Sequence, residues 1–150
     1  MLEDLRRMDG YHAQMASGRV GELGFSADIV LPDRPSEYFA RNVWIGASFP
    51  SPSEADAMKK VGIERMMWGS DYPHNESTFP YNRDHLRRSF SGWDEADLRK
   101  VFAENAAEVY RIDLDALAPL AERIGPSVDE VATPLDEVPK DAFSPAFTRP

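Results

Sequence analysis

Hydrophobic positions recur at steps of three or four over residues 2–16, the spacing that lines up one face of a helix. The residues on this face are Leu2, Leu5, Met8, His12 and Met15. The intervening positions are polar, so the chain is predicted to begin with an amphipathic helix. His12 falls within the apolar stripe, which indicates a structural role.

Residues 17–41 break this periodicity with glycine, proline and charged side chains. The pairs Leu31-Pro32 and Arg34-Pro35 oppose helix, because proline disfavours the helical conformation of the residue before it. The pattern predicts a long loop, with one short helical turn at Ser36–Phe39.

A strand-helix-strand pattern follows. Residues 42–49 are β-branched and aromatic and stop at Pro50, which is typical of a strand. Ser53 is the expected N-cap of a helix whose apolar stripe ends at Gly62. Residues 63–69 are apolar without alternation, as in a strand of a buried parallel sheet. These segments predict a βαβ unit.

The remaining periodic segments predict helices over residues 82–90, 95–110 and 113–125. Asp94 is the expected cap of the second helix, and Pro119 is expected to bend or break the third. Arg87 and Arg88 are expected on a solvated face. From Ser127 the chain is acidic and proline-containing, which predicts an extended tail that is either loose or laid across a neighbouring surface.

Composition limits the classes of partner. The chain has 150 residues, is 42% hydrophobic and carries a net charge of −9, which disfavours nucleic acid and anionic membrane surfaces. The absence of cysteine excludes disulfides and thiolate metal sites. The acidic first residues do not resemble a signal peptide and no window is apolar enough to span a bilayer, so a cytoplasmic location is expected.

The candidate chemistry lies in the run from Arg65 to His74. Asp71 lies just past the C-terminal end of the predicted parallel strand, and α/β barrels place their catalytic groups at that end of a strand. A carboxylate there can bind a divalent cation and accept a proton from an attacking water. The alternative is that Asp71 only caps a turn.

Three groups of residues resemble the amidohydrolase superfamily, in the branch of aminocarboxymuconate semialdehyde decarboxylase and the dihydroxybenzoate decarboxylases. They are Pro35–Phe39 with Arg41–Trp44, then Trp68–His74, then Glu104–Ala107 with Val109-Tyr110. The resemblance implies an α/β fold, with these segments as the last two strands and following helices of a (β/α)8 TIM barrel. It also implies that Asp71 is a catalytic residue and metal ligand, with zinc as the expected metal.

Within the same resemblance, His74 is the candidate substrate-binding residue, against the alternative of an exposed hydrogen-bonding histidine. The family's remaining ligands are histidines on earlier strands, and His12, His74 and His85 do not reproduce their pattern. The substrate class implied is a small carboxylate, amide or lactone, either hydrolysed or decarboxylated without oxidation.

Two strands cannot close a barrel, and a complete one takes on the order of 250 residues. We therefore expect residues 1–125 to be the C-terminal segment of such a barrel and residues 126–150 to be a tail. On this expectation the chain is inactive alone and associates with a chain that supplies the missing strands, or with itself. The alternative is a non-catalytic remnant that serves as an interaction or oligomerisation module.

Overall fold

The computed structural model describes residues 1–18 and 30–150, which form two compact units, Met1–Val43 and Trp44–Pro150. The part of the predicted loop that falls on residues 19–29 lies outside the described residues. No helix within the described ranges has the length and apolar character needed to cross a lipid bilayer.

The first unit contains two helices, α1 (Leu2–Ala16) and α2 (Pro35–Asn42), and neither buries a side chain fully. Asp9 on α1 accepts hydrogen bonds from the backbone N–H and the hydroxyl of Ser36, at 2.9 and 2.6 Å. These bonds from Ser36 lower the pKa of Asp9. The helix α1 was predicted correctly, whereas α2 is longer than the predicted turn because Pro35 occupies a first-turn position, where proline favours helix.

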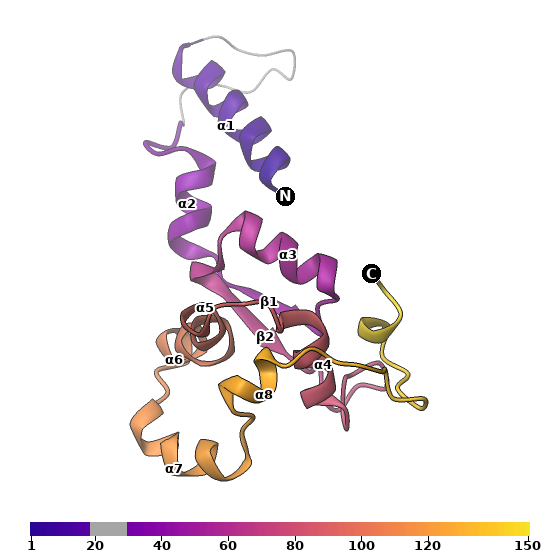
Figure 1. Ribbon diagram of the computed structural model, residues 1–150. Helices are drawn as coiled ribbons and strands as arrows, with labels where there is room; N and C mark the ends of the chain where they lie inside the picture. Colours follow the sequence, from indigo (N-terminus) through magenta and orange to yellow (C-terminus); the bar gives the residue numbers. More distant parts are fainter. Residues whose placement is uncertain (19–29) are drawn as a thin grey trace. The chain divides into compact units, whose positions relative to one another are not determined.

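The second unit begins with the predicted βαβ arrangement, β1 (Ile45–Ser48), α3 (Pro52–Val61) and β2 (Met66–Gly69). The strands pair in parallel, with Ile45 opposite Met66 and Ser48 opposite Gly69 (Figure 1). Both strands are shorter than predicted. Helix α2 takes up Asn42 and its C-cap is Val43, so β1 begins later, and Ile63–Arg65 forms a 3-10 turn before β2. The mixed helix and strand content with a parallel pair is that of an α/β domain.

The cap of α3 differs from the prediction. Ser51, not Ser53, precedes the helix, and its backbone N–H donates to the Glu54 carboxylate at 2.8 Å. Pro52 takes the first helical position, where its missing N–H leaves nothing unsatisfied. Ser53 instead donates its hydroxyl to the carbonyl of Pro150 at 2.6 Å, so the helix start also holds the end of the chain.

Helices then follow along the chain. They are α4 (Asn82–Phe90), α5 (Glu95–Arg99), a π-helical turn (Lys100–Glu104), α6 (Asn105–Tyr110), α7 (Leu114–Ile124) and α8 (Val128–Ala132). Helix α4 has the predicted bounds, and α7 runs through Pro119. Residues from β2, α3, α4, α5 and α8 share one hydrophobic core, which includes Met58, Met66, Phe90, Leu98 and Val131.

The stretch after Ser127 is laid across the second unit rather than being extended throughout. It contains α8 and a 3-10 turn at Pro145–Phe147, in which Ala146 and Phe147 are buried. Arginines of α4 hold it: Arg87 donates to the carbonyls of Thr133 and Pro134 at 3.0 and 2.9 Å. The sequence prediction that Arg87 and Arg88 lie on a solvated face was therefore wrong, since Arg88 also donates to tail carbonyls.

Candidate metal-binding site

The candidate site is the loop that leaves β2, residues 70–78, which we call the Asp71 loop. The Phe49 N–H donates to the Gly69 carbonyl at 2.8 Å, which extends the pairing to the last residue of the strand. Asp71 follows two residues later, at the C-terminal end of a parallel strand, as the sequence predicted. In open and closed parallel α/β sheets this end of the strands is where ligands bind.

Backbone hydrogen bonds fix the course of the loop. The N–H of His74 donates to the Asp71 carbonyl at 2.9 Å, and the N–H of Ser77 donates to the His74 carbonyl at 3.1 Å. The N–H of Thr78 then returns to the Ser70 carbonyl at 3.1 Å and closes the loop at its base. The loop is thus tied down at its base while its tip projects outward.

Asp71 has an unusual backbone conformation, with φ of 63°. Few residues other than glycine adopt this left-handed region, although aspartate does so more readily than most. Such conformations cost free energy and are concentrated at sites of function. The strain therefore agrees with a requirement for the side chain of Asp71 to point in one direction.

Three potential ligands meet in this loop. One oxygen from each of Asp71 and Glu76 and one ring nitrogen of His74 all lie within 4.8 Å of one another. Asp71 is half-buried, whereas His74 and Glu76 are exposed. Zinc bonds to such donors are about 2.0–2.2 Å long, so small side-chain rotations would bring all three atoms onto one ion. An imidazole and two carboxylates fit a divalent cation of the zinc or first-row type.

Glu76 was not predicted from the sequence. The available signal was the spacing of Asp71, His74 and Glu76 inside one short loop bounded by Gly69 and Pro80. That spacing alone does not imply convergence. The side chains meet because the turn from Asp71 to His74 and the next turn from His74 to Ser77 fold the segment back on itself.

The other two histidines lie elsewhere. The ring of His12 lies 2.7 Å from the Leu31 carbonyl through Nε2, within the first unit. His85 is fully buried: its Nε2 donates to the Pro50 carbonyl at 2.8 Å, and its Nδ1 accepts from Trp68 Nε1 at 3.4 Å. Both rings are held by protein partners away from the loop, and for His12 this agrees with the structural role that its place in the apolar stripe indicated. Within the described residues, the Asp71 loop is the one place where three such side chains gather.

The burial of His85 fixes its protonation state. Removal from water lowers its pKa to about 4, although the hydrogen bond with Pro50 opposes this shift. The positive charges of Arg88 and Arg149 add to the lowering. His85 is therefore neutral in the fold, which agrees with one ring nitrogen donating and the other accepting.

A family model described as Amidohydrolase matches residues 30–112, which is more than half of the chain. Two short parallel strands with helices packed against them place the second unit among the α/β folds. The family match is more specific, and the chain belongs to the amidohydrolase family. Members of this family are generally metal-dependent. Neither a curated protein nor a solved structure matches the chain.

Proposed function

We propose that the Asp71 loop binds a divalent cation, with zinc as the expected metal, and that the protein serves hydrolysis or non-oxidative decarboxylation of a small carboxylate, amide or lactone. The observation that supports this is the convergence of Asp71, His74 and Glu76 at the C-terminal end of β2. Family membership supports it independently.

Each residue has a proposed role. Asp71, His74 and Glu76 would hold the ion, which supplies Lewis-acid polarisation of a substrate carbonyl. Asp71 is the proposed catalytic residue: when a water attacks, its carboxylate accepts the proton. This assignment follows from its position nearest the strand end and from its half-buried carboxylate, which is better shielded than that of Glu76. Binding of substrate, rather than metal, is the alternative role for His74.

We further propose that the βαβ unit corresponds to the last strands of a (β/α)8 barrel of the aminocarboxymuconate semialdehyde decarboxylase-like branch. A catalytic zinc takes three protein ligands and keeps a position open for substrate or water. The family resemblance implies further histidine ligands on earlier strands, and His12 and His85 are engaged away from the loop, so such histidines would come from a partner chain that supplies those strands. On this proposal the described residues alone are inactive.

Zinc titration of the full chain by calorimetry tests the metal site. We expect one zinc per chain, and substitutions Asp71→Asn, His74→Gln and Glu76→Gln that each weaken binding. The loss should exceed the roughly 10–100-fold that removal of an outer-shell partner causes. Zinc at a hundredfold excess over its Kd should also stabilise the fold by about 2.7 kcal/mol, read from thermal unfolding.

Asp136→Asn is the matched control, because Asp136 is an exposed carboxylate of the same unit outside the loop. It should bind zinc like the unsubstituted chain. Equal binding by the control and all three loop variants would contradict the assignment, as would the absence of any binding. If His74→Gln alone retains zinc affinity, His74 takes the substrate-binding role instead.

A second candidate function, self-association without catalysis, is favoured by one observation. Helix α7 buries none of its residues, and Leu117, Leu120 and Ile124 are 44%, 42% and 60% exposed. Apolar side chains that repeat along one helix and face water are typical of an interaction surface. Sedimentation of the chain and of Leu117→Glu distinguishes the two: a dimer that the substitution dissociates favours association, and a monomer in both cases contradicts it.

A further inference from the structure

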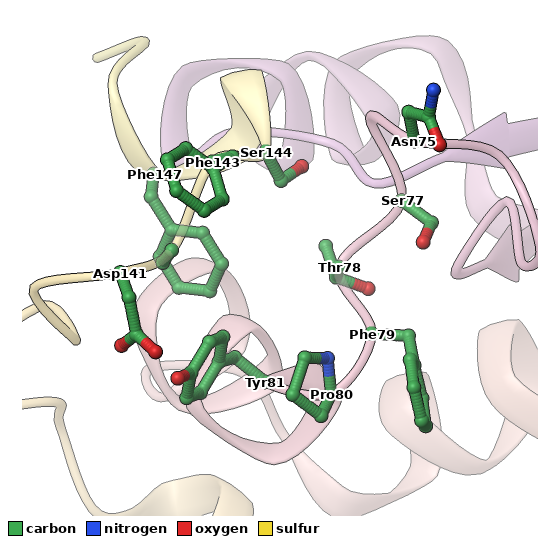
Figure 2. Close-up of a pocket in the computed structure, with 11 residues that line it drawn as sticks. Asn75, Ser77, Thr78, Phe79, Pro80, Tyr81, Asp141, Phe143, Ser144 and Phe147 are labelled. Carbon is green, nitrogen blue, oxygen red and sulfur yellow. The ribbon is translucent and has the colours of Figure 1, made fainter.

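The second unit contains a cavity of about 210 Å³, separate from the three metal-ligating side chains. Asn75 and residues 77–81, which lead from the Asp71 loop into α4, form one wall, and residues 141–144 and 147 of the tail form the other (Figure 2). Two segments that are far apart in sequence thus enclose it. The tail wall is anchored beside the cavity, where Ala146 and Phe147 are buried.

Aromatic side chains make up much of the lining. Phe147 is buried at the back, whereas Phe79 and Phe143 line the cavity with 59% and 87% of their surfaces exposed. A ligand seated against the exposed ring of Phe143 would cover apolar surface that water now contacts, which is favourable. Figure 2 shows Phe143 and Phe147 on the tail side and Phe79 on the loop side.

Asp141 is the one charged side chain among the residues that line the cavity. The Tyr81 hydroxyl donates to the Asp141 carboxylate, and this bond, followed by burial and the negative charges of Asp141 and Asp84, raises the pKa of Tyr81. No lysine, arginine or histidine is among the residues that line the cavity. A cation is therefore favoured there over an anion.

The volume sets the size of the occupant. An apolar cavity of about 150 Å³ in another protein holds benzene, and pockets for drug-sized ligands begin near 300 Å³. A volume of 210 Å³ lies between these limits. It suits a single six-membered ring with a short substituent.

We propose that this cavity is a binding site for a small aromatic amine, with the ring between Phe143 and Phe147 and the ammonium group at the Asp141 carboxylate. Cations also bind favourably against aromatic faces, which the same walls supply. The site requires neither zinc nor the ligands in the Asp71 loop. It is thus independent of the proposed metal chemistry.

The proposal is tested by titrating the full chain with benzylamine, benzyl alcohol and benzoate in the presence of a chelator. Backbone amide NMR monitors each titration. The three probes share a ring and differ in charge. Benzylamine should perturb amides of residues 75–81 and 141–147 and bind most tightly, and benzoate should bind most weakly. Asp141→Asn should weaken benzylamine binding by about two- to fivefold, the scale of an exposed charge pair. Phe143→Ala should weaken it by roughly two- to tenfold.

Both substituted residues are exposed, so the variants are expected to fold. Tyr110→Ala is the control, because Tyr110 is 68% exposed in the same unit and does not line the cavity. Benzoate binding as tightly as benzylamine, perturbations confined to other residues, or no binding would each overturn the proposal. Benzylamine binding that persists in Asp71→Asn, with zinc binding lost, separates this site from the metal site.

Discussion

His85, beneath the sheet, and His74, on the loop beyond it, carry the same side chain in opposite surroundings. His85 is fully buried, and both ring nitrogens have protein partners. His74 is exposed, and its ring lies beside the carboxylates of Asp71 and Glu76. A buried imidazole with both nitrogens occupied stabilises the fold, whereas an exposed one beside two carboxylates is available to an ion.

The same contrast extends to the regions around the two histidines. Beneath the sheet, His85, Phe90 and Trp93 form an aromatic cluster. The ring centroid of Phe90 lies 6.2 Å from that of His85 and 5.0 Å from that of Trp93. In the Asp71 loop, by contrast, residues 72–76 are exposed and backbone hydrogen bonds fix the course of the chain. Substitutions should therefore affect stability beneath the sheet and ligand binding in the loop.

The largest expected effect is at Phe90, which is 0% exposed. Phe90→Ala should lower the free energy of unfolding by about 3–5 kcal/mol, because it removes a ring from a packed core and leaves a cavity. Urea denaturation followed by circular dichroism measures the change. Phe143→Ala is the matched control, since Phe143 is 87% exposed and its loss should change stability by no more than about 0.5 kcal/mol. If Phe90→Ala and Phe143→Ala lowered the free energy of unfolding by similar amounts, packing beneath the sheet would not be what sets stability there.

The next effect is the pH dependence that His85 confers. Its pKa falls from 6.5 to about 4 on folding, so between these values the unfolded chain binds a proton that the folded chain does not. The stabilisation is thus fully present above pH 6.5 and is lost as the pH falls toward 4. The loss attributable to His85 should be about 3 kcal/mol.

His85→Gln tests this dependence, because glutamine can donate to Pro50 and accept from Trp68 without titrating. Urea denaturation across this pH range should give a shallower loss of stability for the variant than for the unsubstituted chain. His74→Gln, in which His85 is intact, should keep the steep loss. Parallel curves for His85→Gln and the unsubstituted chain would rule out His85 as the source.

A smaller effect is expected at Asn105, which joins α6 to the start of β2. Its Nδ2 donates to the carbonyls of Ile63 and Met66, each at 2.7 Å, and its side chain is buried. Asn105→Ala leaves two carbonyls without this partner and should cost about 1–3 kcal/mol in urea denaturation. The exposed Asn75 provides the control, since Asn75→Ala should remain within about 0.5 kcal/mol. If Asn105→Ala costs no more than the control, its hydrogen bonds do not hold β2 in place.

Sequence patterns predicted helix α4 and the pairing of the two strands better than they predicted which side chains meet in the Asp71 loop. The bounds of α4 and the parallel arrangement of β1 and β2 follow from local periodicity and from the turn residues between the strands. The cap of α3 was misassigned to Ser53, because its true cap depends on Glu54 reaching back to Ser51. The sequence pattern does not show which of the two serines can receive the Glu54 side chain, and that contact decides which one is the cap.

Long-range contacts account for the other differences. Arg87 has the helical position of a solvated residue, and only the path of the tail brings carbonyls to it. The position of Asp71 just past the end of β2 could be predicted because it is a local feature of the sequence, whereas Glu76 comes close to it only through two successive turns. Whether Asp71, His74 and Glu76 bind metal stays a prediction for the titration to test.

The smallest expected effect on stability is at Asp71, where two substitutions separate the residue's contribution to folding from its contribution to zinc binding. A non-glycine residue at φ of 63° is strained, and alanine there costs about 1–2 kcal/mol relative to an ordinary conformation. Glycine avoids that strain but adds about 0.5–1 kcal/mol of chain entropy to the unfolded state. Asp71→Gly should therefore be about as stable as the unsubstituted chain, with Asp71→Ala roughly 1 kcal/mol below it, by urea denaturation. Both should lose zinc affinity, and a glycine variant that unfolds far more readily would mean that the Asp71 side chain supports the fold rather than a ligand.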